Sequence, residues 1–317
     1  MKTQIMKKLT VATLLMSLLP IANAEENLWM YSKGTDTRPQ GSTEIKLSNI
    51  SRLDKGSNDY TFHDIRPEIE YGITDRLTIG FEAMYFMHDY KMDEEIGPMF
   101  ETAGGLGKTY KKNQLGGFEV AAKYNIYSPY KDWLGLSLGL AYEKRNRYRL
   151  DGANIDQNSY VGTIFLQKDY LDDTLIFVVN TKMELERRKS PDVLEEEIAF
   201  DLSAGVSYRF APKWFAGLEV RMQSDYLNPE EGGVFDNTLD RSSWDISDMR
   251  LGTQHQYGTY FGPSLHYAEE KWWATVAALW QVKGGGSHHS FPASGKTGYN
   301  WDEHEKLHLG LSVGYEF

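Results

Sequence analysis

The stretch LHLGLSVGYEF (residues 307–317) decides the fold. From Leu307 to Phe317 every second residue is apolar, and the residues between them are small, polar or charged. This strict alternation predicts a β-strand with one apolar and one polar face. A strand this regular needs partners on both sides, because an open edge invites aggregation. A closed barrel meets that need, since its last strand pairs with its first.

The N-terminus has the pattern of a secretory signal peptide. Three lysines precede an apolar stretch over residues 9–21, which is followed by ANA at residues 22–24. This pattern predicts cleavage before Glu25. The apolar run is shorter than the roughly 18 residues that a transmembrane helix needs. We therefore expect a signal peptide over residues 1–24 and one outer-membrane β-barrel domain over residues 25–317.

The composition narrows the class of protein. Without residues 1–24, which contain three lysines and no acid, the chain has 31 basic and 45 acidic residues and a net charge of −14. Such an acidic chain is not expected to bind nucleic acid, because that affinity depends on positive charge. With no cysteine, it has no disulfide framework, thiolate chemistry or lipid-modified cysteine. A soluble exported protein and an outer-membrane barrel are the two classes left.

Alternation recurs along the chain and predicts about twelve strands of the length with which tilted strands cross a bilayer. The segments are 43–53, 60–73, 76–88, 115–126, 133–145, 158–168, 174–186, 196–210, 213–223, 252–267, 271–282 and 303–317. The predicted fold is all-β, a transmembrane antiparallel up-and-down β-barrel. Because segment 158–168 does not choose a face cleanly, ten to fourteen strands stay possible. Pro67 and Pro263, within two segments, suggest bulges, since each removes a ladder donor.

The connections alternate between short and long. Short ones fall at 72–76, 128–132, 169–173, 211–213 and 268–271, and long ones at 89–114, 146–157, 187–195, 224–251 and 283–302. Bacterial outer-membrane barrels have short periplasmic turns and long outer loops. Aromatic residues beside the short turns predict a girdle at the membrane interface; they are Tyr71, Tyr130, Trp133, Tyr170, Trp214, Trp272 and Trp273. We expect the protein in the outer membrane of a Gram-negative cell, in contact with lipid and lipopolysaccharide.

Three stretches carry resemblances. The terminal strand, with Gly310, Val313, Tyr315 and Phe317, resembles the assembly signal of outer-membrane proteins, which implies recognition by the barrel-assembly machinery. YSKGTDTRPQGSTEIKL (31–47) and RPEIEYGITDRLTIGFEAMY (66–85) resemble an uncharacterised family of Gram-negative outer-membrane β-barrels. The second is also similar to the phenol-degradation (MetA-pathway) type of outer-membrane transporter. This implies a barrel and a transport role, with no catalytic residues to transfer.

The polar strand faces supply candidate pore-lining residues. Both signs of charge occur there, with acids in excess: Asp64, Arg66, Glu68, Glu70, Glu82, Glu119, Lys123, Glu143, Arg145, Lys182, Glu184, Asp201, Arg209, Glu219 and Arg221. Rings of charge select ions of the opposite sign. We therefore expect a porin-like channel for passive uptake of small solutes, with a weak cation preference. Mixed charges could also pair across the lumen and nearly close it.

Two other functions stay open. The long loops 89–114, 224–251 and 283–302 would serve a structural or surface-binding barrel. Ser264 and His266 share a strand face, so a lipid hydrolase is the less favoured alternative, although that face is the predicted lumen. No cofactor is expected. No metal site is expected either, since the adjacent His288 and His289 lack a carboxylate or cysteine at ligand spacing.

Overall fold

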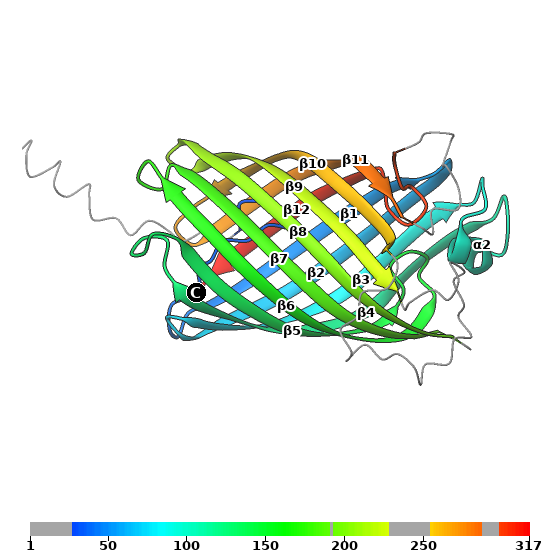
Figure 1. Ribbon diagram of the computed structural model, residues 1–317, viewed down its shortest axis with the longest axis horizontal. Helices are drawn as coiled ribbons and strands as arrows, with labels where there is room; N and C mark the ends of the chain where they lie inside the picture. The colour runs from blue at the N-terminus through cyan, green and yellow to red at the C-terminus, as the bar shows by residue number, and fades with distance from the viewer. Residues whose placement is uncertain (1–26, 191–192, 228–253, 287–297) are drawn as a thin grey trace, which may run out of the picture.

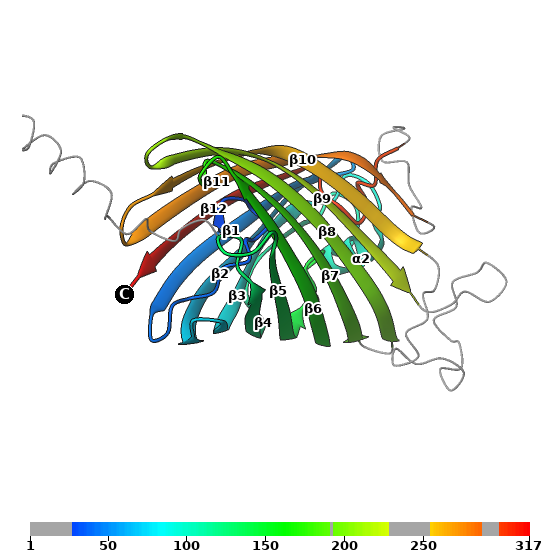
Figure 2. The same cartoon turned by 60° about the vertical axis from the view of Figure 1, so that its left-hand side comes forward.

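The computed structural model describes residues 27–190, 193–227, 254–286 and 298–317; the predicted signal peptide lies outside them. Twelve antiparallel strands form a closed barrel in which each pairs with its neighbours in sequence and β1 pairs with β12 (Figures 1 and 2). The strands are β1 (Thr43–Lys55), β2 (Asn58–Thr74), β3 (Leu77–Lys91), β4 (Thr109–Tyr127), β5 (Gly135–Arg147), β6 (Asn154–Tyr170), β7 (Leu175–Ser190), β8 (Val193–Ala211), β9 (Trp214–Leu227), β10 (Gln254–Ala268), β11 (Trp272–Gly285) and β12 (Leu307–Glu316). The predicted fold class and strand count are confirmed.

The terminal strand closes the barrel. On one side of β12, Tyr315 lies opposite Ile45 of β1, and on the other side it lies opposite Trp272 of β11. Both edges of β12 are therefore paired, as the alternation required.

The barrel has two distinct ends. The short connections 75–76, 128–134, 171–174, 212–213 and 269–271 gather at the end where the C-terminus lies, here called the turn end (Figure 1). The opposite end, here called the loop end, carries the helix α2 (Gly97–Ala103). No helix in the described ranges is long and apolar enough to span a membrane.

The loop end differs from two expectations. Residues 187–190 and 193–195 are not loop, because β7 and β8 stay paired as far as Ser190 and Val193. The stretch 89–114 is shorter as a loop than predicted, since β3 and β4 extend into it and α2 occupies its middle. Parts of the other two long loops, residues 228–253 and 287–297 with both adjacent histidines, lie outside the described residues.

The two strand prolines do not sit at bulges. Pro67 lies opposite Leu47 and Pro263 opposite Leu218 without a change of register at either position. Each proline instead lacks a partner in its other ladder, with β3 and β11 respectively. A register shift occurs at the glycine pair of β4, where Gly117 faces Met84 and Leu115 faces Tyr85.

The exterior is apolar. Side chains such as Ile79, Phe81, Val120, Leu140 and Val276 are exposed to the surroundings of the barrel. Six of the seven predicted girdle aromatics are exposed near the turn end. Trp273 is the exception: it is 1% exposed and donates its indole N–H to a Glu44 carboxylate oxygen at 3.2 Å. It faces inward because it follows Trp272, and neighbouring residues of a strand point to opposite faces.

At the loop end the inner face of β2 and β3 becomes apolar. Its side chains form a buried cluster with residues from the adjoining loops: Tyr60, Phe62, Met84, Phe86, Tyr90, Met92, Ile96, Met99, Tyr110 and Leu150. The β5–β6 connection folds onto this cluster, where Tyr60 donates its hydroxyl to the Leu150 carbonyl (2.9 Å) and Tyr90 to the Asp151 carbonyl (3.0 Å). The lumen is thus partly filled at this end.

Candidate functional site: the lumen

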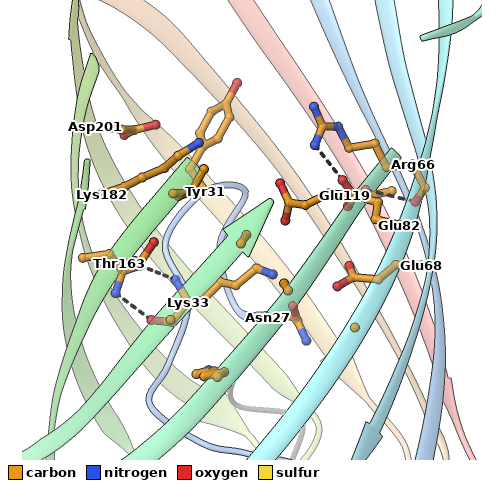
Figure 3. Close-up of a pocket in the computed structure, with 18 of the residues that line it drawn as sticks. Asn27, Tyr31, Lys33, Arg66, Glu68, Glu82, Glu119, Thr163, Lys182 and Asp201 are labelled. Carbon is orange, nitrogen blue, oxygen red and sulfur yellow. Dashed lines mark hydrogen bonds and ion pairs between the residues drawn. The ribbon is translucent and has the colours of Figure 1, made fainter. Parts of the chain in front are cut away.

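The described part of the chain before β1 lies largely inside the barrel. This N-terminal segment, residues 27–42, is anchored at the turn end, where the Gln40 N–H donates to an Asp75 carboxylate oxygen at 2.9 Å. From there it reaches into the lumen as far as Tyr31, whose hydroxyl lies 2.7 Å from Nδ1 of His308 on β12. Figure 3 shows Tyr31 and Lys33 of this segment within the ring of strands.

Inward side chains satisfy the backbone of the segment. The carboxylate of Glu219 accepts N–H groups from Met30 (3.1 Å), Tyr31 (3.0 Å) and Ser32 (2.5 Å). A buried backbone group that lacks secondary structure must find another partner, or folding loses free energy. Glu219 therefore acts as a backbone clamp, and its predicted place on the inner face is observed.

Lys123 donates its ammonium to the Gly34 carbonyl at 2.8 Å, and neutral side chains make further backbone contacts. Ser264 donates its hydroxyl to the Leu28 carbonyl (2.9 Å) and Thr275 donates to the Asn27 carbonyl (2.6 Å). On β7, Asn180 accepts from the Lys33 N–H (2.6 Å) and donates to the Lys33 carbonyl (2.9 Å). Side chains of β7, β10 and β11 thus hold one strip of chain between them.

Apolar contacts seat the segment near the turn end. Leu28 and Trp29 form a buried cluster with Ile176, Val178 and Phe215. The sequence contains a signal for this contact. LIFVV, residues 175–179, is apolar on both strand faces, so its inward side needs an apolar partner.

Glycines make room for these side chains. A Cβ atom built at Gly205 would lie 2.5 Å from the Trp29 ring, and one at Gly310 would lie 2.7 Å from the Met30 methyl group. Real Cβ atoms do not approach other atoms this closely. The two glycines therefore permit the segment to lie against β8 and β12.

A cavity of about 300 Å³ lies between the N-terminal segment and the strands (Figure 3). Ten of the fifteen predicted pore-lining residues border it: Asp64, Arg66, Glu68, Glu70, Glu82, Glu119, Lys123, Lys182, Asp201 and Arg221. Of the other five, Glu143, Arg145 and Glu184 form buried ion pairs and Glu219 clamps the segment. Arg209 lies near the turn end and donates to the Asp172 carbonyl at 3.0 Å.

Four further cavity-lining cations were missed by the sequence reasoning: Lys33, Lys46, Arg52 and Arg149. Two of them, Lys46 and Arg52, lie on β1, where alternation places them on the inner face. Their omission changes the charge balance, because the wall of the cavity carries eight basic and six acidic side chains. The acidic excess predicted for the inner strand faces does not extend to this wall.

Charges of opposite sign pair along the inner wall, within one strand or between neighbouring strands. Arg66 contacts Asp64 (2.8 Å) and Glu82 (2.6 Å), and Arg221 contacts Asp201 (2.5 Å). Buried ions of this kind need partners because they have lost their hydration. The inner wall therefore carries a set of ion pairs and not a ring of side chains with one sign of charge.

Two inward-folded connections complete the site at the loop end. In the β11–β12 connection, Glu305 lies 3.1 Å from Lys55 Nζ and 3.0 Å from His308 Nε2. Burial alone would raise the pKa of Glu305, but the Lys55 and Arg52 cations and the His308 hydrogen bond hold it well below its ordinary value. Burial lowers the pKa of the neighbouring His304 to about 3, so this histidine is neutral.

The serine–histidine pair suggested for a hydrolase does not form. Ser264 is bonded to the N-terminal segment, and Nδ1 of His266 lies 2.7 Å from the Thr275 hydroxyl. Both side chains are buried beneath the segment, away from lipid. In the described part of the chain, no group of three or more histidine, aspartate or glutamate side chains is placed to hold a metal ion.

The closed barrel and its polar lumen define the fold class of outer-membrane β-barrels. Residues 21–317 match the model of a family of unknown function, DUF6662, and the chain belongs to that family. No curated protein matches the chain. The resemblance to the phenol-degradation type of transporter stays a prediction.

Solved structures of similar fold are outer-membrane barrels. The COG4313 outer membrane channel from Pseudomonas putida F1 aligns with a TM-score of 0.56 at 12% identity, over 89% of this chain and 98% of that one. The KdgM porin (TM-score 0.42, 13% identity, 86% and 99% covered) and the NanC porin (0.46, 10%, 86% and 98%) align less well. At these identities the first likeness shows the fold alone, and the other two carry no argument.

Proposed function

We propose that this protein is an outer-membrane channel through which small solutes diffuse passively, with the N-terminal segment narrowing the lumen. The observation that carries the proposal is a charged cavity of about 300 Å³ enclosed by a barrel with an apolar exterior. Such an exterior suits hydrocarbon, and such an interior suits water and polar solutes. The turn end would face the periplasm and the loop end the outside of the cell.

Two considerations bear on the proposal. The fold likeness to a protein described as an outer membrane channel agrees with it. The weak cation preference stays a prediction from the sequence, and the wall of the cavity, with more basic than acidic side chains, favours the opposite sign.

The test is the conductance of the refolded mature chain in a planar bilayer, beside a variant that lacks residues 27–35. The deletion removes the part of the N-terminal segment that occupies the lumen and leaves all twelve strands. We expect small or intermittent current steps from the full chain and larger, steady steps from the deletion variant. Migration of unheated and heated samples on a gel verifies that both barrels are folded. A folded deletion variant that carries no current overturns the proposal.

A further inference from the structure

We infer that the cavity binds a small organic anion with a compact apolar body, of the kind represented by a single-ring aromatic carboxylate. The inference names a solute class for the lumen of the proposed channel. It rests on that proposed function only for the route by which the solute enters. Binding itself follows from how the wall is built.

The cavity exists because three adjacent strands carry short side chains at one level of the inner wall. Ala121 of β4 lies opposite Ala141 of β5, and Ala141 lies opposite Val161 of β6. Small barrels are usually filled by their inward side chains. A row of two alanines and a valine does not reach the centre, so an apolar patch is left facing open space.

The next row towards the turn end places a cation on each side of a gap. Lys123 lies opposite Gly139, Gly139 opposite Thr163, and Thr163 opposite Lys182. The two residues between the lysines are glycine and threonine, whose short side chains leave room for another group. Two ammonium groups thus flank the apolar patch, and that of Lys123 also donates to the Gly34 carbonyl at 2.8 Å.

An aromatic ring borders the same gap. The Phe165 ring lies beside Gly139, where a Cβ atom would be 2.9 Å from it. The ring centroid is 4.8 Å from Lys123 Nζ. A flat apolar body could therefore rest against Phe165 and the alanines, with a charged group towards the lysines. Figure 3 shows Lys33 and Lys182 reaching into the cavity from the N-terminal segment and from β7.

The charge balance favours an anion over a cation. Five of the six acidic side chains of the wall contact a cation, as in the pairs of Asp64 with Arg66 and of Asp201 with Arg221, and the sixth, Glu119, has no ion pair among the described residues. Lys182 shares its carboxylate partner, because Glu184 contacts both Lys182 (3.0 Å) and Arg145 (3.1 Å). The lining carries eight basic and six acidic side chains, so an anion there meets more basic than acidic groups, although Glu143 and Glu305 outside the lining pair Arg149 and Arg52.

The volume limits the ligand to a small one. A cavity of about 300 Å³ is at the lower end of the range for ligand pockets. It corresponds to roughly ten water molecules at about 30 Å³ each. One ring with one carboxylate fits this space, whereas a polymer would have to displace the N-terminal segment.

The test is ligand binding to the folded protein in detergent, measured by fluorine NMR, because it requires no current. The probes are fluorobenzoate, its neutral analogue fluorobenzyl alcohol and its cationic analogue fluorobenzylamine. We expect fluorobenzoate to bind at least about tenfold more tightly than either analogue, the effect of a charge-assisted hydrogen bond. Equal affinity for the three probes, or tighter binding of the amine, overturns the inference.

Paired variants locate the site. Lys182→Met should weaken fluorobenzoate about tenfold and leave the alcohol unchanged, while Lys182→Arg should retain the preference. Arg145 still pairs Glu184 in the methionine variant, so the barrel should fold. Ala141→Phe should abolish binding of all three probes by filling the patch.

The controls are Lys213→Met, at an exposed turn-end pair with Glu269, and Gly162→Phe, at a site with nothing within 4 Å. If the controls weaken binding as much as Lys182→Met and Ala141→Phe, the inference fails.

Selective binding by a barrel whose deletion variant is electrically silent would overturn the channel and keep this site. Current through the deletion variant without selective binding of fluorobenzoate would keep the channel and overturn this site.

Discussion

Tyr31 and His308 connect the N-terminal segment to the loop end of the barrel, with the Tyr31 hydroxyl 2.7 Å from His308 Nδ1. The contact continues outward, because the other ring nitrogen of His308 lies 3.0 Å from Glu305 in the β11–β12 connection. The Arg221 guanidinium also sits 3.6 Å from the centre of the Tyr31 ring. A single tyrosine thus joins a segment that enters at the turn end to a connection at the opposite end.

Tyr31→Phe should loosen the N-terminal segment. The change removes one hydrogen bond and keeps the ring, so we expect a loss of about 1 kcal/mol, or about fivefold in the population of the released segment. The chain has no cysteine, so Ser32→Cys gives a single reporter at a buried site. Its rate of labelling by a maleimide measures release. Tyr208→Phe, on the exposed outer face, is the control, and equal rates in both variants would contradict the prediction.

Gly205→Ala should displace Trp29. The added Cβ atom would lie 2.5 Å from the indole ring, and overpacking of this kind costs about 1–3 kcal/mol. We expect faster labelling of the Ser32→Cys reporter and larger current steps in the bilayer. Gly162→Ala adds the same methyl group where nothing lies within 4 Å, and should change neither quantity. Unchanged labelling in Gly205→Ala would show that the segment does not depend on this contact.

Glu219→Gln should release the same segment through its backbone. One of the two carboxylate oxygens becomes an NH₂ group, which leaves a backbone N–H of residues 30–32 without an acceptor at a cost of about 1–3 kcal/mol. Labelling of the Ser32→Cys reporter should rise about tenfold. Glu269→Gln, in an exposed turn, serves as the control. Combination with Gly205→Ala should give less than the sum of the two effects, because both act on one segment.

The β5–β6 connection should be held most tightly against the inner wall of β2 and β3 at low pH. Burial raises the pKa of Asp151 above its ordinary value of 3.8, so the folded connection favours the protonated carboxyl. Its contribution to stability is complete below pH 3.8 and is lost as the pH rises through the raised pKa. Hydrogen exchange of residues 148–153, corrected for the intrinsic rate, should therefore show protection that falls as the pH rises through this raised pKa. The same pH dependence in Asp151→Asn would refute this account.

Phe317→Ala should lower the amount of protein assembled in the outer membrane. The side chain is exposed on the outer face, and the ring lies 4.9 Å from that of Tyr315. The refolded barrel should lose little stability, since an exposed ring has little packing to lose. Phe210→Ala, at another exposed position, is the matched control for cell fractionation. Equal outer-membrane levels of the two variants would argue against an assembly role for the terminal residue.

Much of the barrel could be predicted because the signal is local. A strand with lipid on one side and a polar lumen on the other must alternate, so each segment shows its structure within about ten residues. The predictions of loops are wrong where the sequence no longer alternates between apolar and polar residues. Residues 187–190, at the end of β7, are Arg, Arg, Lys and Ser, so both faces of the strand are polar there and the stretch resembles a loop.

The local sequence pattern was enough to predict the strands, most of their inner and outer faces, and the closing role of residues 307–317. What occupies the lumen became clear only from the folded barrel. The N-terminal segment has no periodicity, and its clamp Glu219 is 187 positions from Ser32 along the chain. Such contacts depend on which strands face each other across the barrel, and no local pattern records that. The charge of the cavity was decided in the same way, because residues from β1, from the segment and from a folded connection meet only after the barrel has closed.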